Sequence, residues 1–75
     1  MRNMYYNAGK RIRELRKRKG YTGENLAEKA EISAKFLYEI ENGIKGFSAY
    51  TLGKIARALD VNSDYILFGD DSKNG

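Results

Sequence analysis

The chain has 75 residues and a formal net charge of +4, and it contains neither Cys nor His. Without these residues it has no disulfide, no thiolate metal site and not the commonest general base, so we expect no enzymatic activity, no metal and no cofactor. We expect one soluble, cytoplasmic domain, because this length supports one small core and no apolar run has the length of a membrane helix or signal peptide.

The first predicted helix is amphipathic and strongly basic. Ala8, Ile12 and Leu15 recur at helical spacing, and Gly20 is placed to end the helix. Residues 1–20 hold eight Lys or Arg and one Glu, a net charge of +7, which leaves −3 for the rest of the chain. Such an uneven charge directs a protein towards a polyanion such as nucleic acid, although a merely solvated helix face is the alternative.

A second helix is predicted after Thr22, a suitable N-cap, with Glu24 in its first turn. Its inward residues are Leu26, Ala27 and Ala30. Only the three residues Glu31–Ser33 separate it from the third helix, too few for an antiparallel hairpin, so the two helices should cross steeply. The small side chain of Ala27 suits such a crossing. A helix held in this way can present its outer face to the major groove of DNA.

Three more helices complete the predicted all-α fold of about five short helices. Ser33 would cap the third, which ends at Asn42 and Gly43, and Ser48 would cap the fourth. Ser63 would start the short fifth helix. The inward residues of the third and fourth helices are Leu37, Ile40, Leu52, Ile55, Ala56 and Leu59, and the fifth contributes Tyr65, Ile66 and Leu67. We divide the chain into an N-terminal arm (1–8), a helical domain (9–68) and a disordered tail (69–75).

Three stretches, RIRELRKRKGYTGENLAEKAEIS, FLYEIENG and TLGKIARALDVNSDYIL, carry a family resemblance. From about Gly9 to Phe68 the chain resembles the Cro/C1-type, or Xre, family of helix-turn-helix regulators. The resemblance implies a lambda-repressor-like domain of bacterial or phage origin that regulates transcription, most often as a repressor. It also implies a homodimer on double-stranded DNA, with near-palindromic half-sites about one helical turn apart. No small-molecule ligand is indicated.

The resemblance further implies roles for the recognition helix, residues 33–42, and the loop after it. Ser33 would cap the helix and touch phosphate, while Ala34, Lys35, Phe36 and Glu39 would face base edges or phosphates, with Tyr38 beside them. Lys35 would donate to guanine or phosphate, and Phe36 would meet a thymine methyl. Glu39 would accept from cytosine N4 or pair with Lys35. Further phosphate contacts are expected, partly through backbone N–H groups, from Asn42, Gly43 and Lys45. Arg11 and Arg18 are additional basic anchors.

Two positions depart from the family pattern, and one pair follows it. Gly23 stands where the family usually has a phosphate-binding Gln, so only its N–H could meet a phosphate. Glu31 stands where the family usually has Gly, which implies a strain of about 1 kcal/mol if its φ is positive. Arg16 and Glu41 match positions that often form an interhelical ion pair, and we expect them to orient the recognition helix.

A second interpretation uses the same fold as a protein-interaction module, such as an antitoxin-like subunit. Gly23, Glu39 and the aromatic pair Phe36 and Tyr38 favour it. Apolar side chains that could form a dimer interface lie at both ends of the chain and in the middle. They are Met4, Tyr5, Tyr6, Phe47, Tyr50 and the segment 65–68.

Overall fold

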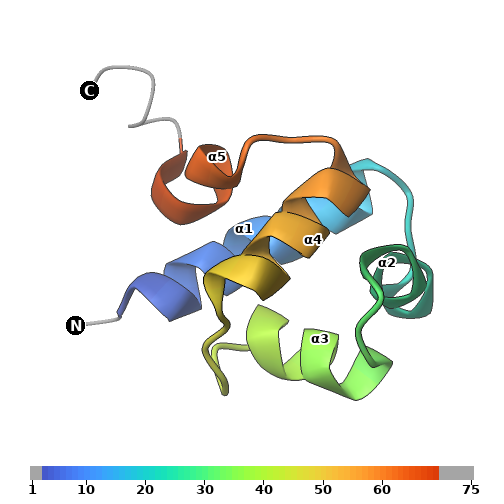
Figure 1. Ribbon diagram of the computed structural model, residues 1–75, viewed down its shortest axis with the longest axis horizontal. Coiled ribbons are helices and arrows are strands. Elements are labelled where there is room, and N and C mark those ends of the chain that lie inside the picture. Colours follow the sequence, from blue (N-terminus) through green and yellow to red (C-terminus); the bar gives the residue numbers. More distant parts are fainter. Residues whose placement is uncertain (1–2, 70–75) are drawn as a thin grey trace.

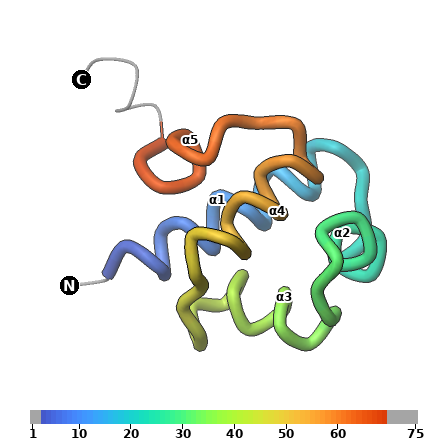
Figure 2. Tube along the Cα trace, in the orientation of Figure 1, coloured from blue at the N-terminus to red at the C-terminus, as the bar shows by residue number. Residues whose placement is uncertain are grey.

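The computed structural model describes residues 3–69, which form five helices and no strand. The helices are α1 (Met4–Arg18), α2 (Gly23–Ala30), α3 (Ala34–Glu41), α4 (Ala49–Leu59) and α5 (Ser63–Phe68). α1 packs against both α3 and α5, which lie on opposite sides of it, and α2 packs against α3 and α4 (Figures 1 and 2). The predicted all-α fold and its helix order are confirmed. None of the described helices is long and apolar enough to cross a membrane.

Each of the predicted N-caps forms its expected hydrogen bond. The backbone N–H groups of Asn25, Phe36 and Thr51 donate to the hydroxyl oxygens of Thr22, Ser33 and Ser48 at 3.0, 3.0 and 3.1 Å. These bonds satisfy donors that the first turn of a helix leaves without an intrahelical partner. The caps therefore set where α2, α3 and α4 begin.

The described structure continues into both of the segments that flank the predicted helical domain. α1 begins at Met4, so residues 4–8 of the expected N-terminal arm are helical. The cause is Asn3, whose side-chain oxygen accepts from Tyr6 N–H at 3.0 Å and caps the helix. Gly69, the first residue of the predicted tail, is buried against the guanidinium of Arg11. Residues 70–75 lie outside the described part of the chain.

The core is formed by the predicted apolar positions. Its fully buried large side chains are Ile12, Leu26, Leu37, Ile40, Ile55, Leu59 and Ile66. Each contributes on the order of 1.5–3 kcal/mol relative to an exposed side chain. Among residues 3–69 no polar side chain is fully buried, and no buried side-chain nitrogen or oxygen lacks a hydrogen-bond partner. The interior of the domain is therefore apolar, and its polar side chains keep some contact with solvent.

α1 passes α3 at Gly9, where the two backbones nearly touch. A Cβ atom at this position would collide with the backbone carbonyl of Ile40 and lie 3.3 Å from the Cα of Glu41. Backbone atoms cannot move aside as a flexible side chain can, so only glycine permits this approach. The contact holds the C-terminal turn of α3 against the middle of α1.

Gly9→Ala should therefore destabilise the domain, although Ala is the better helix former. We expect a loss of about 1–3 kcal/mol from overpacking, which exceeds the gain of about 0.5–1 kcal/mol in helix propensity. Gly53→Ala in α4 is the matched control, because a Cβ there meets nothing within 4 Å. It should be neutral or stabilising. Urea unfolding followed by circular dichroism measures both, and equal effects would contradict the close approach.

Glu31 adopts the left-handed conformation at the end of α2, with φ 59° and ψ 43°. The Ile32 N–H donates to the Ala27 carbonyl at 3.0 Å, and the Lys54 ammonium donates to the Glu31 carbonyl at 3.2 Å. The turn between α2 and α3 thus requires a positive φ from a residue with a side chain. The strain expected from the sequence is present.

Glu31→Gly should stabilise the domain by up to about 1 kcal/mol, because glycine adopts the left-handed conformation without strain. The gain is limited because glycine also increases the conformational entropy of the unfolded chain. Glu28→Gly is the control, since Glu28 is exposed in the ordinary helical part of α2. It should cost about 1 kcal/mol. Thermal unfolding of both variants tests this, and a loss of stability in Glu31→Gly would contradict it.

Candidate nucleic-acid interface

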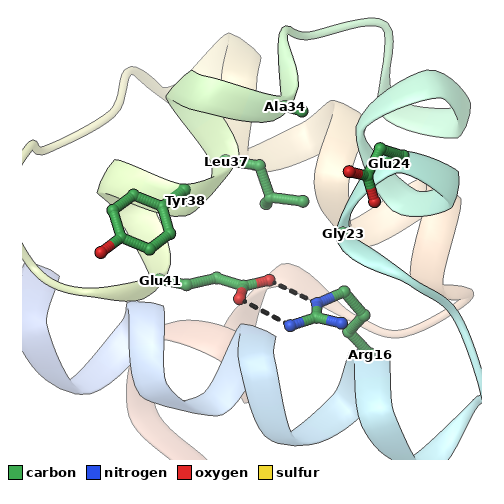
Figure 3. Close-up of a pocket in the computed structure, with 7 residues that line it drawn as sticks. All are labelled: Arg16, Gly23, Glu24, Ala34, Leu37, Tyr38 and Glu41. Atoms are coloured by element: carbon green, nitrogen blue, oxygen red, sulfur yellow. Dashed lines mark hydrogen bonds and ion pairs between the residues drawn. The ribbon is translucent and has the colours of Figure 1, made fainter.

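The recognition helix, α3, is joined to α1 by a bidentate ion pair (Figure 3). Arg16 Nε donates to Glu41 Oε2 at 2.8 Å, and Nη2 donates to Oε1 at 3.0 Å. Arg16 Nη1 also donates to the Tyr21 carbonyl at 3.0 Å. The two side chains are only 14% and 6% exposed. Arg16 and Glu41 thus lie together as the sequence predicts, and the pair is largely shielded from solvent.

The hydrogen bonds that the Arg16 guanidinium donates to the Glu41 carboxylate raise the pKa of Arg16 above its ordinary value. A raised pKa stabilises the folded state at every pH below the unfolded value, so this contribution is fully present under ordinary conditions. Arg16 therefore holds the end of α3 by charge as well as by geometry.

Removal of either partner should cost about 3–5 kcal/mol, because it leaves the other charge desolvated and unpaired. Arg16→Met combined with Glu41→Leu should cost less than the sum of the single changes. Lys45→Ala is the control for an exposed pair and should cost under about 1 kcal/mol. Urea unfolding of all four proteins tests the pair. Single losses below 1 kcal/mol, or strict additivity, would contradict a buried and coupled pair.

The outward face of α3 consists of Ala34, Lys35 and Tyr38, with Asn42 just beyond the helix. All four are exposed, and the Tyr38 side chain is the largest of them, with 62% of the residue accessible. Ser33 is also exposed, at the N-cap. The sequence predicts an outward position for each of these residues, and each is exposed. Ser33, Ala34, Lys35 and Tyr38 lie at the N-cap and in the first two turns of the helix, and Asn42 lies at its C-cap.

Phe36 and Glu39 do not face outward as predicted. Phe36 packs against the hydrophobic core, and the Glu39 side chain is only 17% exposed. Both positions adjoin the buried stripe formed by Leu37 and Ile40. The structure therefore does not bring either side chain into the outward face.

Glu39 pairs with Lys45. The pair of Glu39 with Lys35, one of the two roles that the sequence suggests for this carboxylate, is not formed. The Lys45 ammonium lies 3.7 Å from Glu39 Oε1, and the Lys45 side chain remains 59% exposed. The backbone carbonyl of Glu39 accepts from the N–H groups of Ile44 and Lys45 at 2.8 and 3.3 Å. The loop after α3 thus folds back over Glu39, which is why this carboxylate is shielded.

The backbone N–H groups expected to bind phosphate in this loop have partners within the protein. Asn42 N–H donates to Tyr38 O at 3.1 Å, and Gly43 N–H donates to Ile40 O at 3.1 Å. The Asn42 side-chain nitrogen also donates to Tyr38 O, at 2.8 Å. Gly43, with φ 72°, supplies the left-handed turn after the helix. These donors complete the C-terminal end of α3, and Lys45 is the basic side chain that the loop exposes.

Arg11 lies on the other side of α1 from the recognition helix. Its Nη1 donates to the carbonyls of Ile66 and Leu67 at 3.0 and 3.1 Å, so it holds the end of α5. α5 lies on the opposite side of α1 from α3 (Figure 1). The structure therefore does not place Arg11 with the predicted DNA-binding residues. Arg18, in contrast, is exposed at the end of α1.

Gly23 opens a hollow beside the recognition helix, which we call the Gly23 hollow. Its lining comes from α1, α2 and α3 and consists of Arg16, Gly23, Glu24, Ala34, Leu37, Tyr38 and Glu41 (Figure 3). A Cβ added to Gly23 would meet nothing within 4 Å. The departure at this position therefore leaves real space next to the outward face of α3.

The first turn of α1 supports the loop after α3, a role that the sequence did not reveal. The rings of Tyr5 and Phe47 meet edge to face, with their centroids 5.1 Å apart, and Gly43 lies against Tyr6. Of the suggested dimer-forming residues, those most exposed are Met4, Tyr50 and Phe68. Ile44, which sequence reasoning missed, is 62% exposed.

The family of the chain follows from its similarity to known proteins. Residues 9–72 match the family described as "Helix-turn-helix domain". The chain belongs to this family. Together with the relatives described below, the match confirms the predicted Cro/C1-type helix-turn-helix identity and the lambda-repressor-like fold.

Three relatives illustrate the similarity. The uncharacterized transcriptional regulator YazB of Bacillus subtilis is 43% identical over 56 residues, 75% of this chain and 81% of YazB. The structure of SinR, the master regulator for biofilm formation, in complex with DNA has a TM-score of 0.77 and 38% identity and covers 80% of this chain and 97% of that one. The restriction-modification controller protein C.AhdI from Aeromonas hydrophila has a TM-score of 0.80 and 31% identity, covering 83% and 94%.

Several relatives are longer than the matched region. The chain spans 54% of the length of the SinR protein of Bacillus subtilis and 14% of the regulator RamB of Mycobacterium tuberculosis. The similarity therefore concerns the helix-turn-helix domain that these proteins share with the chain.

Proposed function

We propose that the protein is a sequence-specific DNA-binding regulator of transcription that inserts α3 into the major groove. The observation that carries the proposal is the outward face of α3, which is exposed while the rest of the helix is fixed against α1 by Gly9 and the Arg16–Glu41 pair. A helix presented on a rigid support can reach base edges in a groove of matching width. The DNA-bound structure of the relative SinR supports this use of the fold.

The proposed contacts divide into base reading and phosphate binding. Lys35 and Tyr38 are the exposed side chains of α3 that are long enough to reach base edges, and Ala34 lies beside them. Ser33 at the N-cap, Lys45 in the loop and Arg18 at the end of α1 are suited to phosphate, which attracts hydroxyl and cationic donors. Phe36, Glu39 and Arg11 have no direct part in this interface, because each packs or pairs within the protein.

The proposed regulator acts in the cytoplasm, as a homodimer and as a repressor. One copy offers a single short helix to the groove, so two copies on near-palindromic half-sites would give the affinity that specific regulation needs. Repression is the role that the family resemblance implies, and binding across a promoter would block polymerase. The exposed apolar side chains of Met4, Tyr50 and Phe68 provide surface for contact between copies.

Selection of bound duplexes from a random pool tests the proposal. The protein should enrich one sequence, and its affinity for the selected duplex should fall by about 10³–10⁵ between 50 and 200 mM salt if a dimer makes roughly 6–10 phosphate contacts. Tyr38→Ala or Lys35→Ala should relax selection at particular base positions, at a cost of about 1–3 kcal/mol for a base contact.

Arg57→Ala is the control, since Arg57 is an exposed cation on α4 and not on α3. It should leave the selected sequence unchanged. Sedimentation of the complex gives the number of copies per duplex, with two expected. Failure to bind any duplex at 50 mM salt would refute DNA binding and leave the protein-interaction alternative.

A further inference from the structure

The Gly23 hollow borders the outward face of α3 and so adjoins the proposed DNA interface. Ala34 and Tyr38 belong both to this face and to the walls of the hollow (Figure 3). Leu37 adds a third apolar wall. Any base that meets Ala34 and Tyr38 would therefore bring its edge to the opening of the hollow.

The chemistry of the lining favours an apolar, uncharged group. Most of the exposed lining is apolar, and Arg16 and Glu41 already satisfy each other by two hydrogen bonds. The carboxylate of Glu24 also lines the hollow and repels a phosphate oxygen. The hollow therefore disfavours an anion and favours an alkyl group.

The size of the hollow points to a small group. Its volume is about 180 Å³. Pockets for drug-sized ligands have roughly 300–1,000 Å³, so this hollow is too small for such a molecule. In the major groove, the apolar group that a base offers is the C5-methyl of thymine.

We propose that the Gly23 hollow receives the C5-methyl group of a thymine in the recognised sequence, which makes Gly23 a specificity-determining residue. This inference rests on the proposed function. A glycine at this position loses the side-chain contact with phosphate but gains an apolar recess next to α3. In this account the departure from the family pattern changes what the protein reads, and does not simply weaken its binding.

The test replaces each thymine of the selected duplex by uracil, which differs only in lacking the C5-methyl group. At one position per half-site the wild-type protein should lose about fourfold in affinity, the effect of about 0.8 kcal/mol for one buried methyl. Gly23→Gln should fill the hollow and abolish this preference at that position. Gly53→Gln in α4 should retain the preference, because Gly53 is exposed and a Cβ there meets no neighbour.

The outcomes separate the two proposals. If the wild-type protein binds its selected duplex but no thymine is sensitive to uracil, the inference fails and DNA binding stands. It also fails if Gly23→Gln, shown to be folded by circular dichroism, keeps the same sensitivity. If the wild-type protein binds no duplex, the proposed function itself fails.

Discussion

The direction in which α3 points depends on how closely α1 approaches its C-terminal turn. Gly9 lets the two backbones meet at Ile40, and the Arg16–Glu41 ion pair joins the same turn of α3 to α1 through side chains. A side chain at position 9 would strike the backbone carbonyl of Ile40. Loss of either Arg16 or Glu41 would leave the other charge desolvated and unpaired. Together the two contacts define one orientation for a helix of only eight residues.

That orientation decides which side chains of α3 are available for recognition. With Leu37 and Ile40 in the core, Phe36 and Glu39 are partly covered, and Ala34, Lys35 and Tyr38 are left outside. The N–H groups at the start of the loop after α3 donate to carbonyls of α3 and are not available to bind phosphate. The loop instead exposes the side chain of Lys45. The hollow beside Gly23 then borders the outward face directly.

The helices and their core could be predicted from the sequence because their determinants are local. Ser33 caps α3 by bonding three residues ahead, and the spacing of Leu52, Ile55 and Leu59 alone indicates a buried stripe. The partners of Arg11 and Glu39 could not be predicted in this way. Arg11 bonds a carbonyl 55 residues away, and Glu39 is covered by a loop whose path depends on packing against the first turn of α1.

The most direct test of this account is a nuclear magnetic resonance titration of the ¹⁵N-labelled protein with its selected duplex. A reading surface on α3 predicts that the largest amide shifts occur at Ser33–Tyr38 and at the N-terminal turn of α2, next to the Gly23 hollow. Amides of α5, on the opposite side of α1, should shift less than these, even where Phe68 contacts the second copy. Shifts confined to α5 and the N-terminal turns of α1 and α4 would contradict the account. They would place the DNA contact on the surface that carries Met4, Tyr50 and Phe68, and not on α3.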